Sequence, residues 1–251
     1  MTLEMFYVGG ATCILNIDNS VKIGIDPALA PEGEKVTFKG FTSIKKIGPR
    51  IEEGIFDNID IWLITHMHED HLDNQGVDII SQNSRVICES EGTFHKIDNT
   101  KCKVLAWGNV FSFAKKDISI EIISVPAFHA KNFIVRNSIG QVNGYVLKIQ
   151  SGKTRKIIYF TGDTVFNKTI VDAIPKNIDI MVANLGNARG SKLIGPLTMN
   201  LKMLSQFVKC IEPRIIVPVH IDDYSHYEMT KKQVQDAGYN IFSAGKWISL
   251  T

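Results

Sequence analysis

The segment from Thr65 to His71 constrains this chain more than any other part of its sequence. It reads Thr-His-Met-His-Glu-Asp-His, which places three histidines and an aspartate within six residues. It follows directly on the apolar run from Asp60 to Ile64, which is typical of a strand buried on both faces. Imidazole nitrogens and carboxylate oxygens are ligands for Zn, Mn and Fe ions. The segment therefore predicts a metal site at a strand end, and an exposed loop with incidental histidines is the weaker alternative.

Three further ligand-type residues stand in the same kind of position, just beyond an apolar run. They are His129, Asp163 and His220, which follow the runs 122–128, 157–162 and 215–219. Any one of them alone would more often be a capping or core residue. Together with the 65–71 segment, they predict four strand ends that open on one edge of a two-sheet sandwich.

The rest of the chain predicts an α/β fold. Short apolar runs separated by turn residues predict strands in both halves, and helices follow each set. Apolar residues at helical spacing between Leu197 and Ile211 predict a helix with Thr198 as its N-cap, and a final helix is expected over Tyr227–Ala237. With no repeat and no low-complexity linker, residues 1–251 are expected to form one domain of two packed sheets covered by helices. Residues 28–57 form a long connection with weak periodicity, which is typical of a lid over a pocket.

Composition narrows the function. The net charge is +2, from 28 basic and 26 acidic residues, which argues against a nucleic-acid partner. No apolar run is long enough to cross a bilayer, and the first residues show no signal-peptide core, so a cytoplasmic location is expected. The oligomeric state is left open.

The motifs H-x-H-x-D-H, a strand-end His, Thr-Gly-Asp-Thr and Pro-Val-His resemble, in this order, those of the metallo-β-lactamase superfamily. The resemblance covers almost the whole chain and implies a four-layer αββα sandwich with the metals at one edge. Residues 24–27, 195–199 and 220–224 are most similar to the branch that contains ascorbate-6-phosphate lactonase and related compact hydrolases.

The resemblance also implies a ligand set for two divalent metal ions. One ion would be held by His66, His68 and His129, and the second by Asp70, His71 and His220, with Asp163 bridging the two. Zn is the expected metal, and Mn or Fe can occupy the same ligands.

Such a pair of ions generates a hydroxide near neutral pH and polarises the oxygen under attack. Asp70, His71 and His220 are the expected catalytic residues, with Asp70 orienting the nucleophile as well as binding metal. The predicted function is hydrolysis of a small ester, lactone or phosphoester. Two alternatives stay open, namely a phosphodiesterase acting on nucleic acid or phospholipid, and a metal-holding sensor or scaffold without turnover.

Four residues outside this set are secondary candidates. Asp26 either accepts a hydrogen bond from a ligating histidine or is a turn residue before a proline. His226 either faces the substrate or lies on the surface at the start of the last helix, and the surface is slightly favoured. Arg189 and Lys192 either hold a substrate phosphate or carboxylate or keep a loop soluble.

Overall fold

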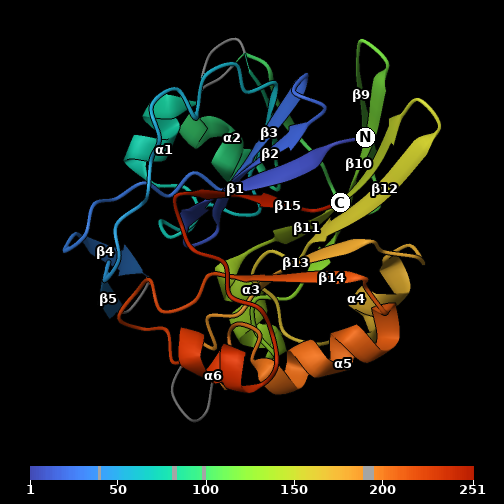
Figure 1. The fold of residues 1–251 in the computed structure, drawn as a ribbon. Helices are drawn as coiled ribbons and strands as arrows, with labels where there is room; N and C mark the ends of the chain where they lie inside the picture. Colours follow the sequence, from blue (N-terminus) through green and yellow to red (C-terminus); the bar gives the residue numbers. More distant parts are fainter. Residues whose placement is uncertain (39–40, 81–83, 98–99, 189–194) are drawn as a thin grey trace.

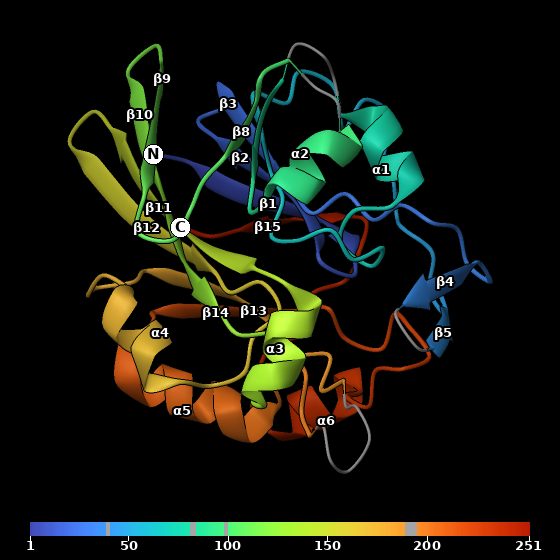
Figure 2. The same ribbon diagram turned by 180° about the vertical axis from the view of Figure 1, so that it is seen from behind.

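The chain folds into two β-sheets that pack face to face, with helices on both outer surfaces (Figures 1 and 2). The computed structural model describes residues 1–38, 41–80, 84–97, 100–188 and 195–251. In spatial order, the strands of the first sheet are β15 (Lys246–Ser249), β1 (Leu3–Gly9), β2 (Thr12–Ile17), β3 (Val21–Ile25), β6 (Ile61–Leu63), β7 (Arg85–Cys88) and β8 (Cys102–Val104). Those of the second sheet are β14 (Ile215–Val219), β13 (Ile180–Asn184), β12 (Thr154–Phe160), β11 (Val142–Ser151), β10 (Ile118–Ala127) and β9 (Val110–Lys115).

Three apolar clusters hold the four layers together. The central one joins the inner faces of both sheets, with residues such as Leu15 and Leu147. A second packs the outer face of the second sheet against the helices α4 (Lys168–Ala173), α5 (Leu201–Ile211) and α6 (Lys231–Asp236). A third covers the outer face of the first sheet beneath α1 (Asn74–Ile79) and α2 (Glu91–Ile97). These layers form the predicted αββα sandwich. Within the described residues, no helix is long and apolar enough to span a membrane.

Strand direction brings the ends that carry the predicted ligands to one edge. In the first sheet β3, β6, β7 and β8 run parallel, so their carboxyl ends lie together. In the second sheet β12, β13 and β14 run parallel. Strand β10 is antiparallel to β11, which is antiparallel to β12, so β10 and β12 end at the same edge. Ligands in open α/β sheets bind at such carboxyl ends.

A small hairpin of β4 (Lys35–Phe38) and β5 (Phe41–Ile44) stands apart from both sheets, within the long connection 28–57 (Figure 1). Backbone bonds tie it to the segment that follows β14. Ser225 N–H donates to the Ile44 carbonyl at 2.9 Å, and Lys46 N–H donates to the Asp223 carbonyl at 2.7 Å. The connection is therefore held against residues 222–226.

Two predicted helix starts are wrong, and the caps explain why. The final helix begins at Lys231 because Thr230 and Gln233 form a capping box there. The preceding helix is capped by Asn200, whose side chain accepts from the Met203 N–H. Thr198 Oγ1 instead accepts from the Ala188 N–H at 2.7 Å, so it is occupied in a loop contact.

Candidate metal centre

The structure brings all seven predicted ligand residues to the shared edge of the two sheets, in two neighbouring groups. Within each group, one possible ligand atom per residue lies within 4.8 Å of the others. The three-histidine group and the mixed group consist, respectively, of His66, His68 and His129, and of Asp70, His71, Asp163 and His220. The four side chains between residues 66 and 71 follow β6. His129 follows β10, Asp163 follows β12 and His220 follows β14.

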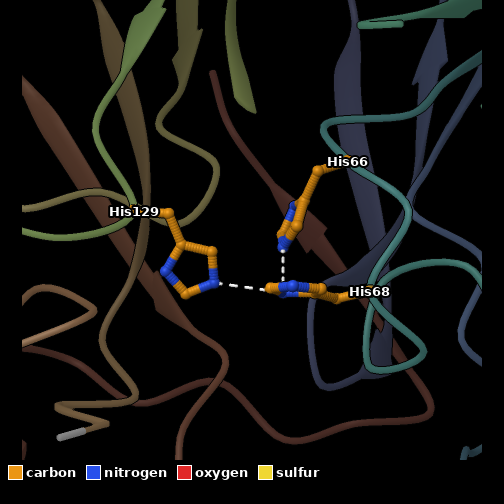
Figure 3. A group of neighbouring side chains, drawn as sticks. All are labelled: His66, His68 and His129. Carbon is orange, nitrogen blue, oxygen red and sulfur yellow. Dashed lines mark hydrogen bonds between the residues drawn. The ribbon is translucent and has the colours of Figure 1, made fainter. Parts of the chain in front are cut away.

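In the three-histidine group, three ring nitrogens converge on one point. His66 Nε2 lies 3.0 Å from His68 Nδ1, and His129 Nε2 lies 3.2 Å from the same atom (Figure 3). Zn–N bonds of 2.0–2.1 Å in a tetrahedral site imply neighbouring nitrogens about 3.3 Å apart. The observed spacings are close to that value, so the rings fit a shared cation.

Asp163 lies between the two groups. Its Oδ1 is 3.3 Å from His71 Nε2 and 3.7 Å from His220 Nδ1, and its Oδ2 is 3.5 Å from His129 Nε2. The Asn184 side chain holds this carboxylate in place by donating from Nδ2 to Oδ1 at 3.0 Å. One carboxylate oxygen therefore faces each group, which is the placement that a bridging ligand requires.

Asp26 sets the tautomers of two of the histidines. Its Oδ2 accepts from His71 Nδ1 at 2.7 Å and from Thr65 Oγ1 at 2.7 Å. Because the Thr65 hydroxyl hydrogen is used in that bond, His66 Nδ1, 3.1 Å away, donates to the Thr65 oxygen. Protons on both Nδ1 atoms leave Nε2 of His66 and His71 with free lone pairs, as metal ligation needs. The hydrogen-bond alternative for Asp26 is the one observed.

Two more of the histidines, His129 and His220, are oriented in the same way. His129 Nδ1 lies 3.0 Å from the Leu197 carbonyl, to which it donates, and this leaves Nε2 for the centre. His220 Nε2 lies 2.6 Å from the Tyr227 hydroxyl, which itself donates to Asp70 Oδ2 at 2.8 Å. The only consistent direction is His220 to Tyr227 to Asp70, so the free nitrogen of His220 is Nδ1.

Buried atoms without hydrogen bonds make the mixed group a candidate cation site. Among the described residues, Asp70 Oδ1, His71 Nε2 and His220 Nδ1 are buried and have no hydrogen-bond partner. Leaving such atoms unpaired costs free energy, and unpaired groups in a native structure often mark the position of a bound ion. All three atoms belong to one group and carry lone pairs, so a divalent ion is the partner that suits them together.

The electrostatics favour the same conclusion. Burial alone would raise the pKa of Asp163, but His220 and His71 hold it well below its ordinary range. Burial would likewise raise the pKa of Asp70, but neighbouring histidines lower it to about 2. For His71, burial lowers the pKa, but Asp163 and Asp26 outweigh it and hold the pKa well above normal, so a cation bound in the mixed group would replace a proton on Nε2. The carboxylates stay ionised and attract positive charge to the mixed group.

His226 faces the centre, which corrects the preference for a surface position. Its side chain is only 16% exposed, and Nε2 lies 3.8 Å from Asp70 Oδ2. It is buried because the hairpin covers it, with the Phe38 ring centroid 4.9 Å from the His226 ring. Phe38 also meets His68 edge-on at 5.7 Å, so the hairpin within 28–57 lies against the centre. Arg189 and Lys192 lie outside the described residues.

Two contributors to the site were missed at the sequence level. Asn184 ends the apolar strand β13, so the strand-end reasoning applied to Asp163 and His220 would have found it. Tyr227 carries no comparable signal, because it stands in a polar loop and its partner Asp70 is 157 positions away.

Comparison with known proteins adds a family assignment to this geometry. A model of the beta-lactamase superfamily domain matches residues 45–221. The UPF0173 protein YddR of Bacillus subtilis is 25% identical over 93% of this chain and 91% of its own length. Relatives from Pyrococcus abyssi and Pyrococcus furiosus are named UPF0173 metal-dependent hydrolases. They are 26% and 28% identical over 83% and 67% of this chain, and over 80% and 69% of their own lengths.

Solved structures share the fold. A possible metal-dependent hydrolase from Veillonella parvula superposes with a TM-score of 0.83 at 18% identity, over 99% of this chain and 100% of that one. An isothiocyanate hydrolase from Delia radicum gut bacteria gives a TM-score of 0.80 at 20% identity, over 98% of both chains. At identities this low, the superpositions show the fold alone, and they confirm the αββα architecture.

Proposed function

Because the chain belongs to the beta-lactamase superfamily and has the metallo-β-lactamase fold, we propose that it is a metal-dependent hydrolase with two divalent ions. The observation that carries the proposal is the set of three unpartnered buried atoms on Asp70, His71 and His220. They sit beside the three-histidine group and share Asp163 with it. The Pyrococcus relatives are named metal-dependent hydrolases and the Veillonella protein a possible one, which supports hydrolysis as the reaction.

The two groups differ in the ligand atoms that they offer to a metal ion. The three-histidine group offers nitrogen ligands, and the mixed group offers two carboxylates and two imidazoles. This combination suits Zn, and Mn or Fe would also fit. When bound, such ions would lower the pKa of a water molecule and polarise the carbonyl or phosphoryl oxygen of the substrate.

The chain's own residues then bind and orient the reactants. Asp70 Oδ2 accepts from the Tyr227 hydroxyl, which fixes the carboxylate with Oδ1 at the mixed group, where it would bind metal and help to orient the attacking water. His71 and His220 complete the mixed group with fixed tautomers. Phe38 covers the side of the centre next to His68 and reduces the access of bulk water. We expect the substrate to be a small ester, lactone or phosphoester. The sequence resemblance to ascorbate-6-phosphate lactonase adds lactones to the test panel.

The proposal is tested on protein purified without added metal. Elemental analysis should find about two divalent ions per chain after equilibration with Zn²⁺, by the ligand count above. A panel of an aryl ester, simple lactones and bis(p-nitrophenyl) phosphate should reveal turnover that a chelator removes and metal restores. His68→Ala should lose metal and turnover, while His95→Ala, which changes an exposed histidine on α2, should keep both. Turnover that survives in metal-free protein would refute the proposal.

A further inference from the structure

His226 lies at the centre without belonging to either metal group. Its ring is in contact with the aromatic side of the hairpin, with the Phe38 and Phe41 centroids 4.9 and 5.4 Å away. One ring nitrogen, Nε2, faces Asp70. The other, Nδ1, lies 2.7 Å from Ser43 Oγ on β5. The imidazole is mostly buried, one nitrogen contacts a serine hydroxyl, and the other faces the candidate metal centre. Packing alone does not require this arrangement.

A pair of serines can hold this ring in a single tautomer. The Ile44 N–H donates to Ser225 Oγ at 2.9 Å, and this bond has only one possible direction. Ser225 Oγ lies 3.1 Å from Ser43 Oγ, so the Ser225 hydroxyl is free to donate to Ser43. In that order the Ser43 hydroxyl donates to His226 Nδ1, whereas in the reverse order His226 Nδ1 donates to Ser43 and Ser43 donates to Ser225. The first order is the one that serves a donor at the centre. This order leaves the ring proton on Nε2.

The carboxylate of Asp70 favours the same tautomer. Asp70 Oδ2 lies 3.8 Å from His226 Nε2, which is too long for a hydrogen bond but close enough for a strong charge interaction. A lone pair on Nε2 would be repelled by the carboxylate, whereas an N–H would be attracted. Of the two hydrogen-bond orders that the serines allow, the charge of Asp70 therefore favours the one with the proton on Nε2.

We propose that His226 is a catalytic residue whose Nε2–H donates a hydrogen bond to the substrate oxygen that gains negative charge during hydrolysis. The inference rests on the proposed function and deepens it. The donor is fixed before the substrate arrives and lies against apolar rings, where a hydrogen bond to developing charge is stronger than in water. No proton has to be transferred for this effect.

A purely structural role for the ring is the competing explanation. The hairpin, however, is already fastened to the 222–226 segment by other bonds. Lys45 and Tyr224 form a β-bridge, and the backbone bonds from Lys46 to Asp223 and from Ser225 to Ile44 lie beside it. The ring is not needed to hold the hairpin, so its removal should leave the fold in place.

The first test reads the tautomer directly and does not depend on turnover. Long-range ¹H–¹⁵N NMR of the zinc-loaded, ¹⁵N-histidine-labelled protein at pH 8, above the ordinary histidine pKa, should show His226 with its proton on Nε2. The signal is assigned by its loss in His226→Phe. Ser43→Ala should shift the population toward the other tautomer. A proton on Nδ1 in the unaltered protein would overturn the inference.

The second test compares two substitutions on the best substrate from the panel. His226→Phe keeps an aromatic ring without a donor, and it should lower kcat about 10²-fold with little change in KM. His226→Gln places an amide N–H near the position of Nε2 and should recover at least about tenfold of that loss. Both variants should keep the metal content of the unaltered protein.

The outcomes separate the two proposals. Normal kcat in His226→Phe would overturn the role of His226 and leave the hydrolase proposal intact. A fall in metal content in that variant would also overturn it, because His226 would then be a ligand. Absence of turnover in the metal-loaded, unaltered protein across the panel would count against the hydrolase proposal itself, while the NMR result would still report on the tautomer.

Discussion

Replacing Asp26 with Asn tests whether this carboxylate prepares the metal centre. The substitution keeps the size of the side chain and one acceptor oxygen, which can still bind the Thr65 N–H that now lies 2.7 Å from Oδ1. It puts an amide N–H₂ where Oδ2 accepts from His71 Nδ1. Both groups would then be donors. The conflict is relieved if the proton of His71 moves to Nε2, and that removes the lone pair needed by the mixed group.

The expected cost follows from the two histidines that Asp26 orients. Substitution of a hydrogen-bond partner of a metal-binding histidine weakens metal affinity 10- to 100-fold, or by about 1.4–2.7 kcal/mol. Because Asp26 also acts on His66 through Thr65, we expect the upper half of that range. Competition with a chromophoric chelator measures the affinity for Zn²⁺, and circular dichroism checks that the variant is folded.

Asp222→Asn is the matched control. Both aspartates have a left-handed backbone, with φ of 43° at Asp26 and 64° at Asp222, and Asn tolerates this conformation as well as Asp does. The Asp222 carboxylate pairs with Lys46 at the surface. The control should therefore bind metal like the unaltered protein. If Asp26→Asn is folded and binds Zn²⁺ equally tightly, the assignment of histidine tautomers by Asp26 is wrong.

Three further changes are expected to have measurable effects. Tyr227→Phe removes the hydroxyl between two mixed-group side chains and should weaken binding of one ion about tenfold, with the other unaffected, in the same chelator assay. Burial raises the pKa of Glu89 to about 7 in the folded protein. Between about pH 4.5 and 7 the unfolded chain has lost this proton and the folded protein still holds it, so the stability should fall as the pH rises through this range. Glu89→Gln should remove this pH dependence and raise the free energy of unfolding at pH 8 by up to roughly 3 kcal/mol. Urea unfolding at pH 5 and 8 measures it, and the same change in stability between the two pH values in the variant and the unaltered protein would contradict the prediction. Gly76→Ala should destabilise the protein by about 1–3 kcal/mol or more, because a Cβ would lie 1.7 Å from the Pro27 carbonyl oxygen. Gly92→Ala meets nothing closer than 3.7 Å and should be neutral or stabilising by up to about 1 kcal/mol; equal melting temperatures for the two glycine variants would contradict the packing argument.

Local patterns in the sequence were sufficient for many of the strands and for the seven ligand-type residues that gather at the centre. The short apolar runs at 12–17, 21–25, 85–88 and 215–219, for example, coincide with β2, β3, β7 and β14. Apolar runs and turn residues act over a few positions, so they can be recognised without knowing the rest of the fold. The same holds for ligand-type residues that follow such runs, because parallel strands end at one edge of a sheet.

The hydrogen-bond partners were decided by the tertiary structure. Asp26 and His71 are 45 positions apart, Asp70 and Tyr227 are 157 apart, and Ser43 and His226 are 183 apart. Whether two such side chains meet depends on how the two sheets pack and on where the hairpin is fastened, neither of which is a local property. Residue type shows that a side chain can donate or accept a proton. Only the packed fold shows which atom it faces, and that atom decides the tautomers of His66, His71, His129 and His220.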